Sequence, residues 1–268
     1  MFWRNGQKID HVAVTDRSFQ YGDGCFTTIL TRYGKLQLWE RHVTRMEKAL
    51  KCLKIAPVDW HALRLEIESH ASDASEAGIK LHVSRGQGGR GYSTKVTKGP
   101  FVTVSSFDFP PNYHEIRENG LELSISDVRL GHNALLAGLK HNNRLEQILA
   151  KENVESSGHL DGIVLDFNGK VIETTMANVF WVNNNQVFTP DLSVAGVAGV
   201  MREVVIEELT LLGIAVNVGH FELEDLLAAE EVFVTNCILG VAPITKIREV
   251  GLSIGPITKQ IQEKLSLC

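Results

Sequence analysis

The sequence contains few cysteines, and none of them stands in a spacing typical of metal sites or redox pairs. The chain has neither a Cys-x-x-Cys pair nor a His-Glu-x-x-His motif. A zinc site and a disulfide framework are therefore not indicated. We expect no bound metal, and reduced thiols at the widely spaced cysteines Cys25, Cys52, Cys237 and Cys268.

Long apolar runs and a surplus of positive charge are also missing. No apolar segment approaches the ~20 residues that span a bilayer, and residues 1–6 lack the apolar stretch of a secretion signal. The net charge is -5, and the basic residues are scattered rather than clustered. Because nucleic acids are bound through clustered positive charge, these absences favour a cytoplasmic protein with no nucleic acid and no membrane as partner.

The chain is long and apolar enough to bury a substantial core. Its 268 residues are 44% hydrophobic and 22% charged, which predicts a folded protein of two lobes. The run Phe109–Asn112 is the best linker candidate, since two prolines and a turn former stop both strands and helices. We place the boundary near residue 115, which gives an N-terminal α+β domain at 1–114 and a β-rich C-terminal domain at 115–268.

Hydrophobic periodicity predicts the elements of both domains. In the N-terminal domain, Val43, Met46 and Leu50 share one face of a helix that ends before Pro57. A second helix is expected at 60–71 and a hairpin at residue 34, with strands at 9–14, 27–33, 80–84 and 101–107. In the C-terminal domain we expect strands at 121–129, 162–166, 179–182 and 231–235, and helices at 142–155, 202–212 and 258–265.

A glycine-rich run follows the predicted strand at 80–84, and its glycines at 86, 88 and 91 have the spacing Gly-x-Gly-x-x-Gly. A dinucleotide-binding turn leads into a helix, whereas this run leads toward another β-rich stretch. We reject that interpretation and predict a mobile glycine loop. In such a loop Arg85 and Arg90 can clamp a carboxylate, and Tyr92 can add a hydroxyl. A plain hairpin loop with solvated arginines is the alternative.

Two ionisable residues of the second half of the chain point to a cofactor. Lys140 leads toward a predicted helix, and Glu173 follows it 33 positions later. A lysine can bond covalently to the aldehyde of pyridoxal 5'-phosphate, and a carboxylate can keep the pyridine nitrogen of that cofactor protonated, so that the ring accepts electrons. The pair therefore indicates this cofactor. A surface lysine and an ordinary strand glutamate are the alternative, since lysines are mostly exposed.

A cofactor phosphate needs an anion site, and the glycine-containing run 196–202 precedes a predicted helix. Backbone amides and the dipole at a helix start favour a phosphate, although glycine is common at helix caps. Asn236, after an apolar strand, can donate from its side-chain amide, and Arg45 can add a permanent positive charge. A solvated position on the polar face of its helix is the alternative for Arg45.

These segments together resemble the fold-type IV pyridoxal phosphate enzymes, which include branched-chain and D-amino-acid aminotransferases and aminodeoxychorismate lyases. The resemblance covers nearly the whole chain and rests on Asp16-Arg17, Tyr21–Phe26, Arg41–Arg45, Lys140 with Asn143, Glu173 with Asn178, Gly199–Arg202 and Val234–Cys237. It implies a two-domain α+β fold with a barrel-like C-terminal lobe, and a homodimer with the active site between the lobes. It also implies that Lys140 binds the cofactor and that Glu173 contacts the pyridine nitrogen. The implied phosphate cradle consists of Arg45, Val200, Met201, Asn236 and Cys237.

Within this group the chain most resembles the aminodeoxychorismate lyases, which convert 4-amino-4-deoxychorismate into 4-aminobenzoate and pyruvate for folate biosynthesis. This resemblance rests on residues 22–28, 84–94, 128–133 and 139–147, and on Thr27, where the transaminases of the group typically carry Glu. It implies that Lys140 acts as base and acid and that Thr28 relays a proton, although a strand threonine is more often ordinary β structure. Arg90 and Tyr92, with Arg85 as a weaker candidate, are expected to hold a substrate carboxylate. A D-amino-acid or branched-chain transaminase is the first alternative, and a non-enzymatic binding protein is the second.

Overall fold

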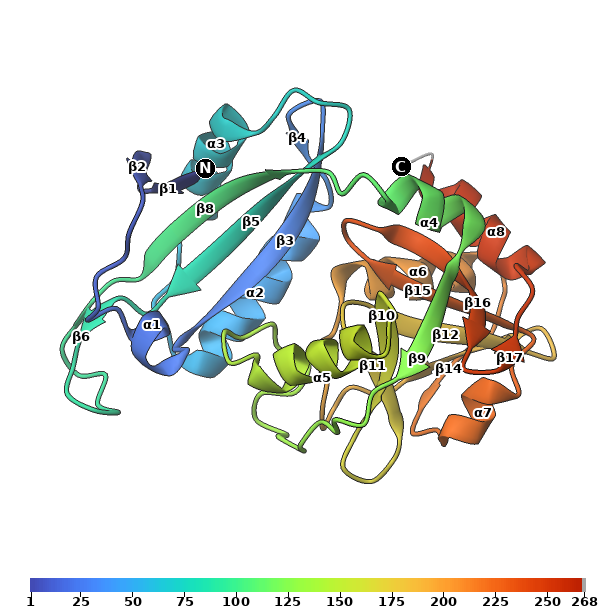
Figure 1. The fold of residues 1–268 in the computed structure, drawn as a ribbon. Coiled ribbons are helices and arrows are strands. Elements are labelled where there is room, and N and C mark those ends of the chain that lie inside the picture. Colours follow the sequence, from blue (N-terminus) through green and yellow to red (C-terminus); the bar gives the residue numbers. More distant parts are fainter. Residues whose placement is uncertain (267–268) are drawn as a thin grey trace. The chain divides into compact units, whose positions relative to one another are not determined.

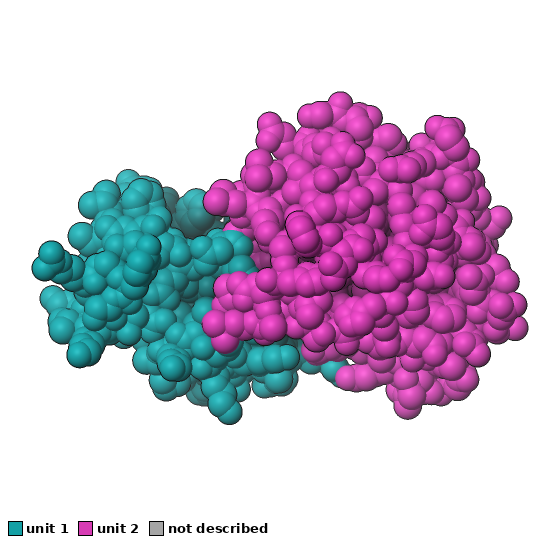
Figure 2. All heavy atoms as spheres, turned by 90° about the horizontal axis from the view of Figure 1, so that it is seen from below, with its two compact units in different colours: residues 1–110, 139–143 teal, residues 111–138, 144–268 magenta. Residues whose placement is uncertain are grey.

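The computed structural model describes residues 1–266 and divides into two compact units (Figure 2). Unit 1 consists of residues 1–110 and 139–143, and unit 2 consists of residues 111–138 and 144–268. The chain thus changes unit at the predicted linker, a few residues before the boundary we placed near residue 115. The sequence analysis did not foresee that residues 139–143 return to unit 1.

Unit 1 is built on an antiparallel sheet with the strand order β2-β1-β8-β5-β3-β4 (Figure 1). Its strands are β1 (Phe2–Arg4), β2 (Gln7–Ile9), β3 (Gly24–Arg32), β4 (Lys35–Leu36), β5 (Ala77–Ser84) and β8 (Phe101–Asp108). A small hairpin of β6 (Gln87–Gly88) and β7 (Thr97–Lys98) lies beside it. The helices of this unit are α1 (Arg17–Tyr21), α2 (Trp39–Leu53) and α3 (Trp60–His70).

The two faces of the unit 1 sheet differ in polarity because side chains alternate along each strand. One face packs α2 and α3 onto an apolar core that includes Ile29, Ile79 and Val104. On the opposite face, Thr28 pairs with Lys80, which pairs with Ser105 on the next strand. This face therefore presents functional groups rather than core.

Unit 2 contains a larger mixed sheet with the order β11-β10-β9-β16-β15-β12-β13-β14, and β17 pairs with β16. Its strands are β9 (Leu121–Ile125), β10 (Asp161–Leu165), β11 (Val171–Thr174), β12 (Asn178–Asn183), β13 (Gln186–Pro190), β14 (Val216–Gly219), β15 (Glu231–Asn236), β16 (Gly240–Ile247) and β17 (Val250–Gly251). Its helices are α4 (Tyr113–Asn119), α5 (Leu145–Ser156), α6 (Val200–Leu211), α7 (Leu223–Leu227) and α8 (Pro256–Ser266). The start of α8 is fixed by the buried Glu231, whose carboxylate accepts hydrogen bonds from the backbone and the hydroxyl of Thr258 at 3.0 and 2.8 Å.

Most of the predicted elements are confirmed, including both helices of the first half, the hairpin at Gly34, and the strands at 80–84 and 101–107. The strand expected at 9–14 is wrong, since β2 ends at Ile9 and the exposed residues after it run on without pairing. The helix expected at 142–155 begins at Leu145, because the residues before it pair with β3 instead. No helix within residues 1–266 is long and apolar enough to cross a membrane. Cys25, Cys52 and Cys237 form no disulfide within residues 1–266, and Cys268 lies outside the described residues.

Candidate active site

Lys140 is held in unit 1 as part of a short extended segment at the start of β3. Its carbonyl accepts a hydrogen bond from Phe26 N–H at 2.9 Å, and Asn142 N–H donates to the Gly24 carbonyl at 3.0 Å. The lysine Nζ lies 4.8 Å from the centre of the Phe26 ring. Strand pairing, rather than the start of a helix, therefore positions this lysine.

Two asparagines that follow Lys140 fasten the same segment to α1 and the turn after it. The Asn142 side chain donates to the Ser18 hydroxyl at 2.7 Å, and the Asn143 side chain donates to the Gly22 carbonyl at 3.1 Å. Gly24 leaves the space for this approach, because a Cβ there would lie 2.5 Å from Asn142 Nδ2. The contacts explain why these residues accompany the lysine in the sequence motif.

Arg45 on α2 is hydrogen-bonded to Thr27, a buried threonine on β3. Between β3 and α2, the Thr27 hydroxyl accepts a hydrogen bond from Arg45 Nη2 and lies 2.7 Å from Nδ1 of His42. Burial, with added repulsion from Arg45 and Lys140, lowers the pKa of His42 to about 3. Burial raises the pKa of the Cys25 thiol to about 12, although Arg45 acts against this rise. His42 and Cys25 are therefore neutral neighbours of the two cations near neutral pH.

A second lysine, Lys80, approaches the same aromatic ring as Lys140, and no sequence motif pointed to it. The Nζ atom of Lys80 lies 4.8 Å from the centre of the Phe26 ring, the same ring that Lys140 approaches. Thr28 is the direct cross-strand partner of Lys80. Alternation along β3 and β5 was the available signal, because it places Phe26, Thr28 and Lys80 on one face.

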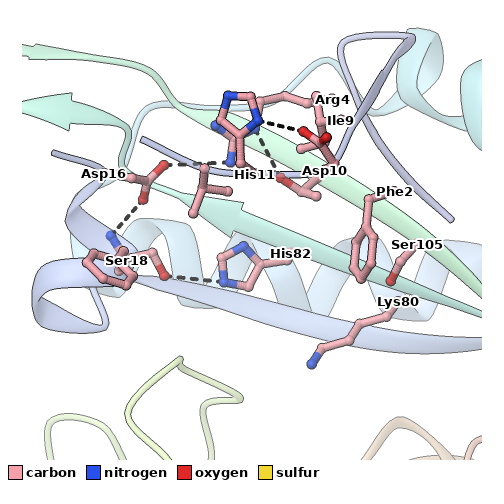
Figure 3. A pocket seen from close by; sticks show the side chains of 13 residues that line it. Phe2, Arg4, Ile9, Asp10, His11, Asp16, Ser18, Lys80, His82 and Ser105 are labelled. Carbon is pink, nitrogen blue, oxygen red and sulfur yellow. Dashed lines mark hydrogen bonds and ion pairs between the residues drawn. The ribbon is translucent and has the colours of Figure 1, made fainter. Parts of the chain in front are cut away.

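That face also carries a pocket of about 510 Å³ within unit 1. Figure 3 shows His82 hydrogen-bonded to Ser18 and Lys80 pointing away from the bonded groups. Burial and the Lys80 charge lower the pKa of His82 to about 4, so that this histidine is neutral near neutral pH. Lys80 therefore supplies an exposed positive charge on the part of the sheet that also holds Thr28.

The glycine loop is anchored in the structure, whereas the sequence analysis predicts a mobile loop. The buried Arg17 donates from Nη1 to the carbonyls of Gly88, Gly91 and Ser93 at 3.4, 3.0 and 3.3 Å, and its Nε bonds to Asp23 at 2.8 Å. The glycines in this loop have positive φ angles, which only glycine adopts readily. The loop continues into β7, which confirms that it is not a dinucleotide-binding turn.

The structure separates the three loop residues that were predicted to bind substrate. Arg85 bonds to Asp23 from Nε at 2.7 Å and donates to the carbonyls of Lys54 and Leu53 at 2.7 and 2.6 Å. Its guanidinium thus ties the loop to the end of α2, which argues against the substrate role that we considered for Arg85. Arg90 is exposed, and Tyr92 is 89% exposed. Arg90 and Tyr92 remain the candidates.

In unit 2, Glu173 on β11 is buried and faces the loop before α6. One of its carboxylate oxygens accepts a hydrogen bond from Val197 N–H at 2.9 Å, and the residue is 6% exposed. Gly138 pairs with the same loop, since its N–H donates to the Gly196 carbonyl and its carbonyl accepts from Ala198 N–H, both at 3.0 Å. The loop that faces Glu173 thus pairs with Gly138, which stands two residues before Lys140 in the chain.

The loop leads into α6, and the start of this helix is suited to bind an anion. The Asn178 side chain holds the end of the loop with two hydrogen bonds, since it donates to the Val197 carbonyl at 2.9 Å and accepts from Gly199 N–H at 3.1 Å. Gly199 is the N-cap of α6, and the structure gives it no side-chain capping bond. The amides at the first turn of α6, which begins with Val200 and Met201, are therefore suited to a bound anion.

Asn236 is the last residue of β15, and Cys237 begins the turn that follows it, in unit 2. Asn236 Oδ1 accepts from the N–H groups of Ile238 and Leu239 at 2.9 and 2.8 Å, and its Nδ2 donates to the Met176 carbonyl at 3.2 Å. A side-chain amide has two donor hydrogens, so one remains for a ligand. The predicted role of Asn236 as a phosphate donor stays a prediction, and the structure adds that this residue shapes the turn.

The fold and the lysine-carboxylate pair place the chain in one class of enzymes. It belongs to the amino-transferase class IV family, which it matches over residues 24–247. It is similar to the aminodeoxychorismate lyase of Vibrio harveyi, with 48% identity over 270 residues that cover 99% of this chain and 100% of that protein. The predicted fold-type IV architecture is confirmed.

Further similarities include one lyase structure and one transaminase sequence. The crystal structure of 4-amino-4-deoxychorismate lyase from Pseudomonas aeruginosa matches with a TM-score of 0.93 and 34% identity, covering 99% of this chain and 98% of that one. The D-alanine aminotransferase of Listeria monocytogenes is 28% identical over 264 residues, covering 94% of this chain and 89% of that protein. The two lyases are thus more similar to this chain than the transaminase is.

Proposed function

We propose that the protein catalyses the pyridoxal 5'-phosphate-dependent elimination of pyruvate from 4-amino-4-deoxychorismate, which yields 4-aminobenzoate. The observation that carries the proposal is the 48% identity with the Vibrio harveyi lyase along 99% of the chain. The likeness to the Pseudomonas aeruginosa lyase structure supports it independently of any single motif. The product is a building block of folate, so the reaction belongs to folate biosynthesis.

The residues present fit this cofactor. Glu173 is a buried carboxylate with one oxygen held by a backbone amide, which suits a contact to a protonated ring nitrogen. The start of α6 at Val200 and Met201 suits the phosphate. Lys140 would hold the aldehyde carbon, and the rest of the phosphate cradle would consist of Arg45, Asn236 and Cys237. When bound, the cofactor withdraws electrons from the substrate carbon that carries the amine.

The side chains of unit 1 would move the protons. The Lys140 amine would take the proton from the ring carbon that bears the substrate amine. The bond between the neighbouring ring carbon and the enolpyruvyl oxygen then breaks, and its electron pair leaves with the oxygen. Lys140, or Thr28 as a relay, returns the proton to the leaving enolpyruvate, which becomes pyruvate. The ring becomes aromatic, which favours the elimination.

Positive charge in unit 1 would hold the carboxylates of the substrate. Arg90 is exposed in the anchored glycine loop, and the exposed Tyr92 beside it can donate a hydroxyl hydrogen bond. Lys80 adds a point charge beside Thr28 on the sheet face. Two carboxylates on one small substrate would therefore meet separate cations, which also disfavours monocarboxylic amino acids as substrates.

We further propose that the protein acts as a cytoplasmic homodimer. Exposed apolar side chains gather on α5 of unit 2, where Leu145, Ile148 and Leu149 are 74%, 59% and 52% exposed. Apolar groups that cluster on a surface favour burial against another chain. Sedimentation of the purified protein would measure the dimer, and Ile148→Glu is expected to shift it toward monomer.

One assay tests the proposed reaction against the transaminase alternative. Purified protein is incubated with 4-amino-4-deoxychorismate, and 4-aminobenzoate and pyruvate are measured as products. Both should form in equal amounts, and the Lys140→Ala variant should form neither. The 28% identity with a D-alanine aminotransferase keeps transamination as the second candidate. Rapid keto acid formation from D-alanine or branched-chain amino acids with 2-oxoglutarate, without 4-aminobenzoate formation, would favour that candidate.

A further inference from the structure

We infer that His42 is a positioning residue for the proposed cofactor site, and that it acts through the Thr27 hydroxyl to set the position of Arg45. The three side chains form one chain of hydrogen bonds in unit 1, from α2 to β3 and back to α2. The inference rests on the proposed function, in which Arg45 binds the phosphate of the cofactor. It adds two residues, Thr27 and His42, that contact neither substrate nor cofactor in the proposal.

The directions of the two hydrogen bonds follow from the chemistry of the groups. A guanidinium only donates, so Arg45 Nη2 is the donor to Thr27 Oγ1. Thr27 is 0% exposed, and its hydroxyl hydrogen therefore needs an acceptor inside the protein. His42 Nδ1 lies 2.7 Å away and is that acceptor if it carries no proton. The hydroxyl thus accepts from Arg45 and donates to His42.

The histidine must then be neutral, with its proton on Nε2. The low pKa of His42, about 3, supports this state, since burial and the charges of Arg45 and Lys140 all disfavour an imidazolium. His42 is 1% exposed, and among residues 1–266 its Nε2 has no hydrogen-bond partner. Thr27 is therefore the group that fixes the ring through a hydrogen bond, and the ring in turn fixes the Thr27 hydroxyl.

The consequence for Arg45 concerns its orientation. Because the Thr27 hydroxyl donates its hydrogen to His42, a lone pair of the Thr27 oxygen faces Arg45 and accepts the hydrogen bond from one edge of the guanidinium. A long arginine side chain otherwise loses conformational entropy when it binds an anion. Preorganisation by Thr27 and His42 lowers this cost, so their loss should weaken phosphate binding without removing any charge.

Equilibrium titration of the full-length apoprotein tests this. Affinity is measured for pyridoxal 5'-phosphate and for pyridoxal, which lacks the phosphate. His42→Phe keeps a ring of similar size, and Thr27→Val keeps the branched shape. Each should weaken pyridoxal 5'-phosphate binding by about three- to tenfold, the effect of one neutral hydrogen bond, and leave pyridoxal binding unchanged. Thr27→Ser and His42→Asn, which retain the hydroxyl and an acceptor, should stay close to the parent protein.

The double variant Thr27→Val/His42→Phe gives a second readout. If the two residues act through one chain of hydrogen bonds, the double variant should have the same affinity for pyridoxal 5'-phosphate as the single variant with the lower affinity. Additive losses, unchanged affinity, or an equal loss for pyridoxal would overturn the inference, since equal losses indicate only a structural role.

Arg45→Ala separates this inference from the proposed function. It should weaken pyridoxal 5'-phosphate binding more than either single variant does, on the order of tenfold to a hundredfold for a charge-assisted contact. If Arg45→Ala leaves the affinity unchanged, the phosphate assignment and this inference both fail. If Arg45→Ala weakens binding and His42→Phe does not, only the inference fails.

Nitrogen NMR of the histidine rings tests the same arrangement without any ligand. His42 is assigned by comparison with His42→Phe. Its signals should be those of a neutral ring with the proton on Nε2 throughout pH 6–9. A proton on Nδ1, or a charged ring at pH 6, would contradict the proposed direction of the hydrogen bonds.

Discussion

The functional residues of the two units differ in what carries their chemistry. In unit 1 the proposed chemistry depends on single charged side chains, of which Lys140 is positioned by strand pairing, Arg45 is hydrogen-bonded to Thr27, and Arg90 is exposed. In unit 2 the proposed chemistry depends on a buried carboxylate, Glu173, and on backbone amides whose loop is shaped by glycines. Activity should therefore be lost in unit 1 when a side chain is removed, and in unit 2 when a larger side chain replaces a glycine of the loop.

A second contrast lies within unit 1, among arginines in or next to the glycine loop. Arg17 of α1 and Arg85 both bond to the carboxylate of Asp23, and both also donate hydrogen bonds to backbone carbonyl groups. Arg90 in the same loop is exposed. Arg17 and Arg85 hold the loop in place, whereas the exposed Arg90 is the residue that we propose to bind substrate. Burial and partners, rather than residue type, separate structural arginines from functional ones.

The largest effect is expected from Lys140→Ala. Removal of the covalent attachment point should reduce kcat by on the order of 10⁴-fold or more and abolish the visible absorbance of lysine-bound cofactor. Lys80→Ala, the matched control on the same aromatic ring, should keep that absorbance. Reduction of the parent protein with borohydride, followed by peptide mapping, should find the pyridoxyl group on Lys140, and labelling of Lys80 instead would refute the assignment.

Glu173→Gln should reduce kcat by on the order of a hundredfold, because an amide cannot hold the pyridine nitrogen protonated. The protein should stay yellow, since the covalent and phosphate contacts remain. Steady-state kinetics with cofactor content measured in parallel would check both statements. If the variant had the same kcat as the parent protein, the proposed role of Glu173 in the reaction would be wrong.

Arg90→Ala should raise KM for 4-amino-4-deoxychorismate by the equivalent of about 1.5–3 kcal/mol, the value of a charge-assisted hydrogen bond. Cofactor content should not change, in contrast to Arg45→Ala. Arg85→Ala is the informative comparison, since loss of its bonds to Asp23 and to the end of α2 should lower thermal stability. An identical KM effect without loss of stability in both variants would mean that Arg85 also binds substrate.

Gly199→Ala tests the backbone cradle of unit 2. A Cβ at this position would lie 2.2 Å from Asn178 Oδ1, so the loop must shift. We expect a loss of about 1–3 kcal/mol in stability from the overpacking, together with weaker cofactor binding. Gly251→Ala, where a Cβ meets no atom within 4 Å, is the control and should leave cofactor binding unchanged.

The smallest effect is expected from Thr28→Val, which keeps the branched shape and deletes the hydroxyl. Elimination should slow by a few-fold to about tenfold if the hydroxyl relays a proton. Stopped-flow spectra should then show unchanged substrate binding, followed by slower appearance of 4-aminobenzoate. An unchanged elimination rate would return Thr28 to a purely structural role in the strand.

The sequence predicted what depends on local pattern. The helix α2 follows from apolar residues at spacings of three and four, and the start of α6, where we propose an anion site, follows from glycines before a helix. The pairing of Lys140 with β3 joins residues more than a hundred positions apart, so no local periodicity shows it. The anchoring of the glycine loop by Arg17 and the link from Thr27 to His42 were also missed, because each contact joins two different elements and leaves no periodicity within either one.

The position of residues 139–143 in unit 1 has a consequence for synthesis on the ribosome. The strand β3 leaves the ribosome more than a hundred residues before Lys140 does, so the edge beside Phe26 is exposed while α4, β9 and the following loop are made. Unpaired strand edges favour association with other chains. A nascent chain halted before residue 139 should thus be prone to aggregation, and release of the next few residues should cover the edge and seat the lysine at the same moment.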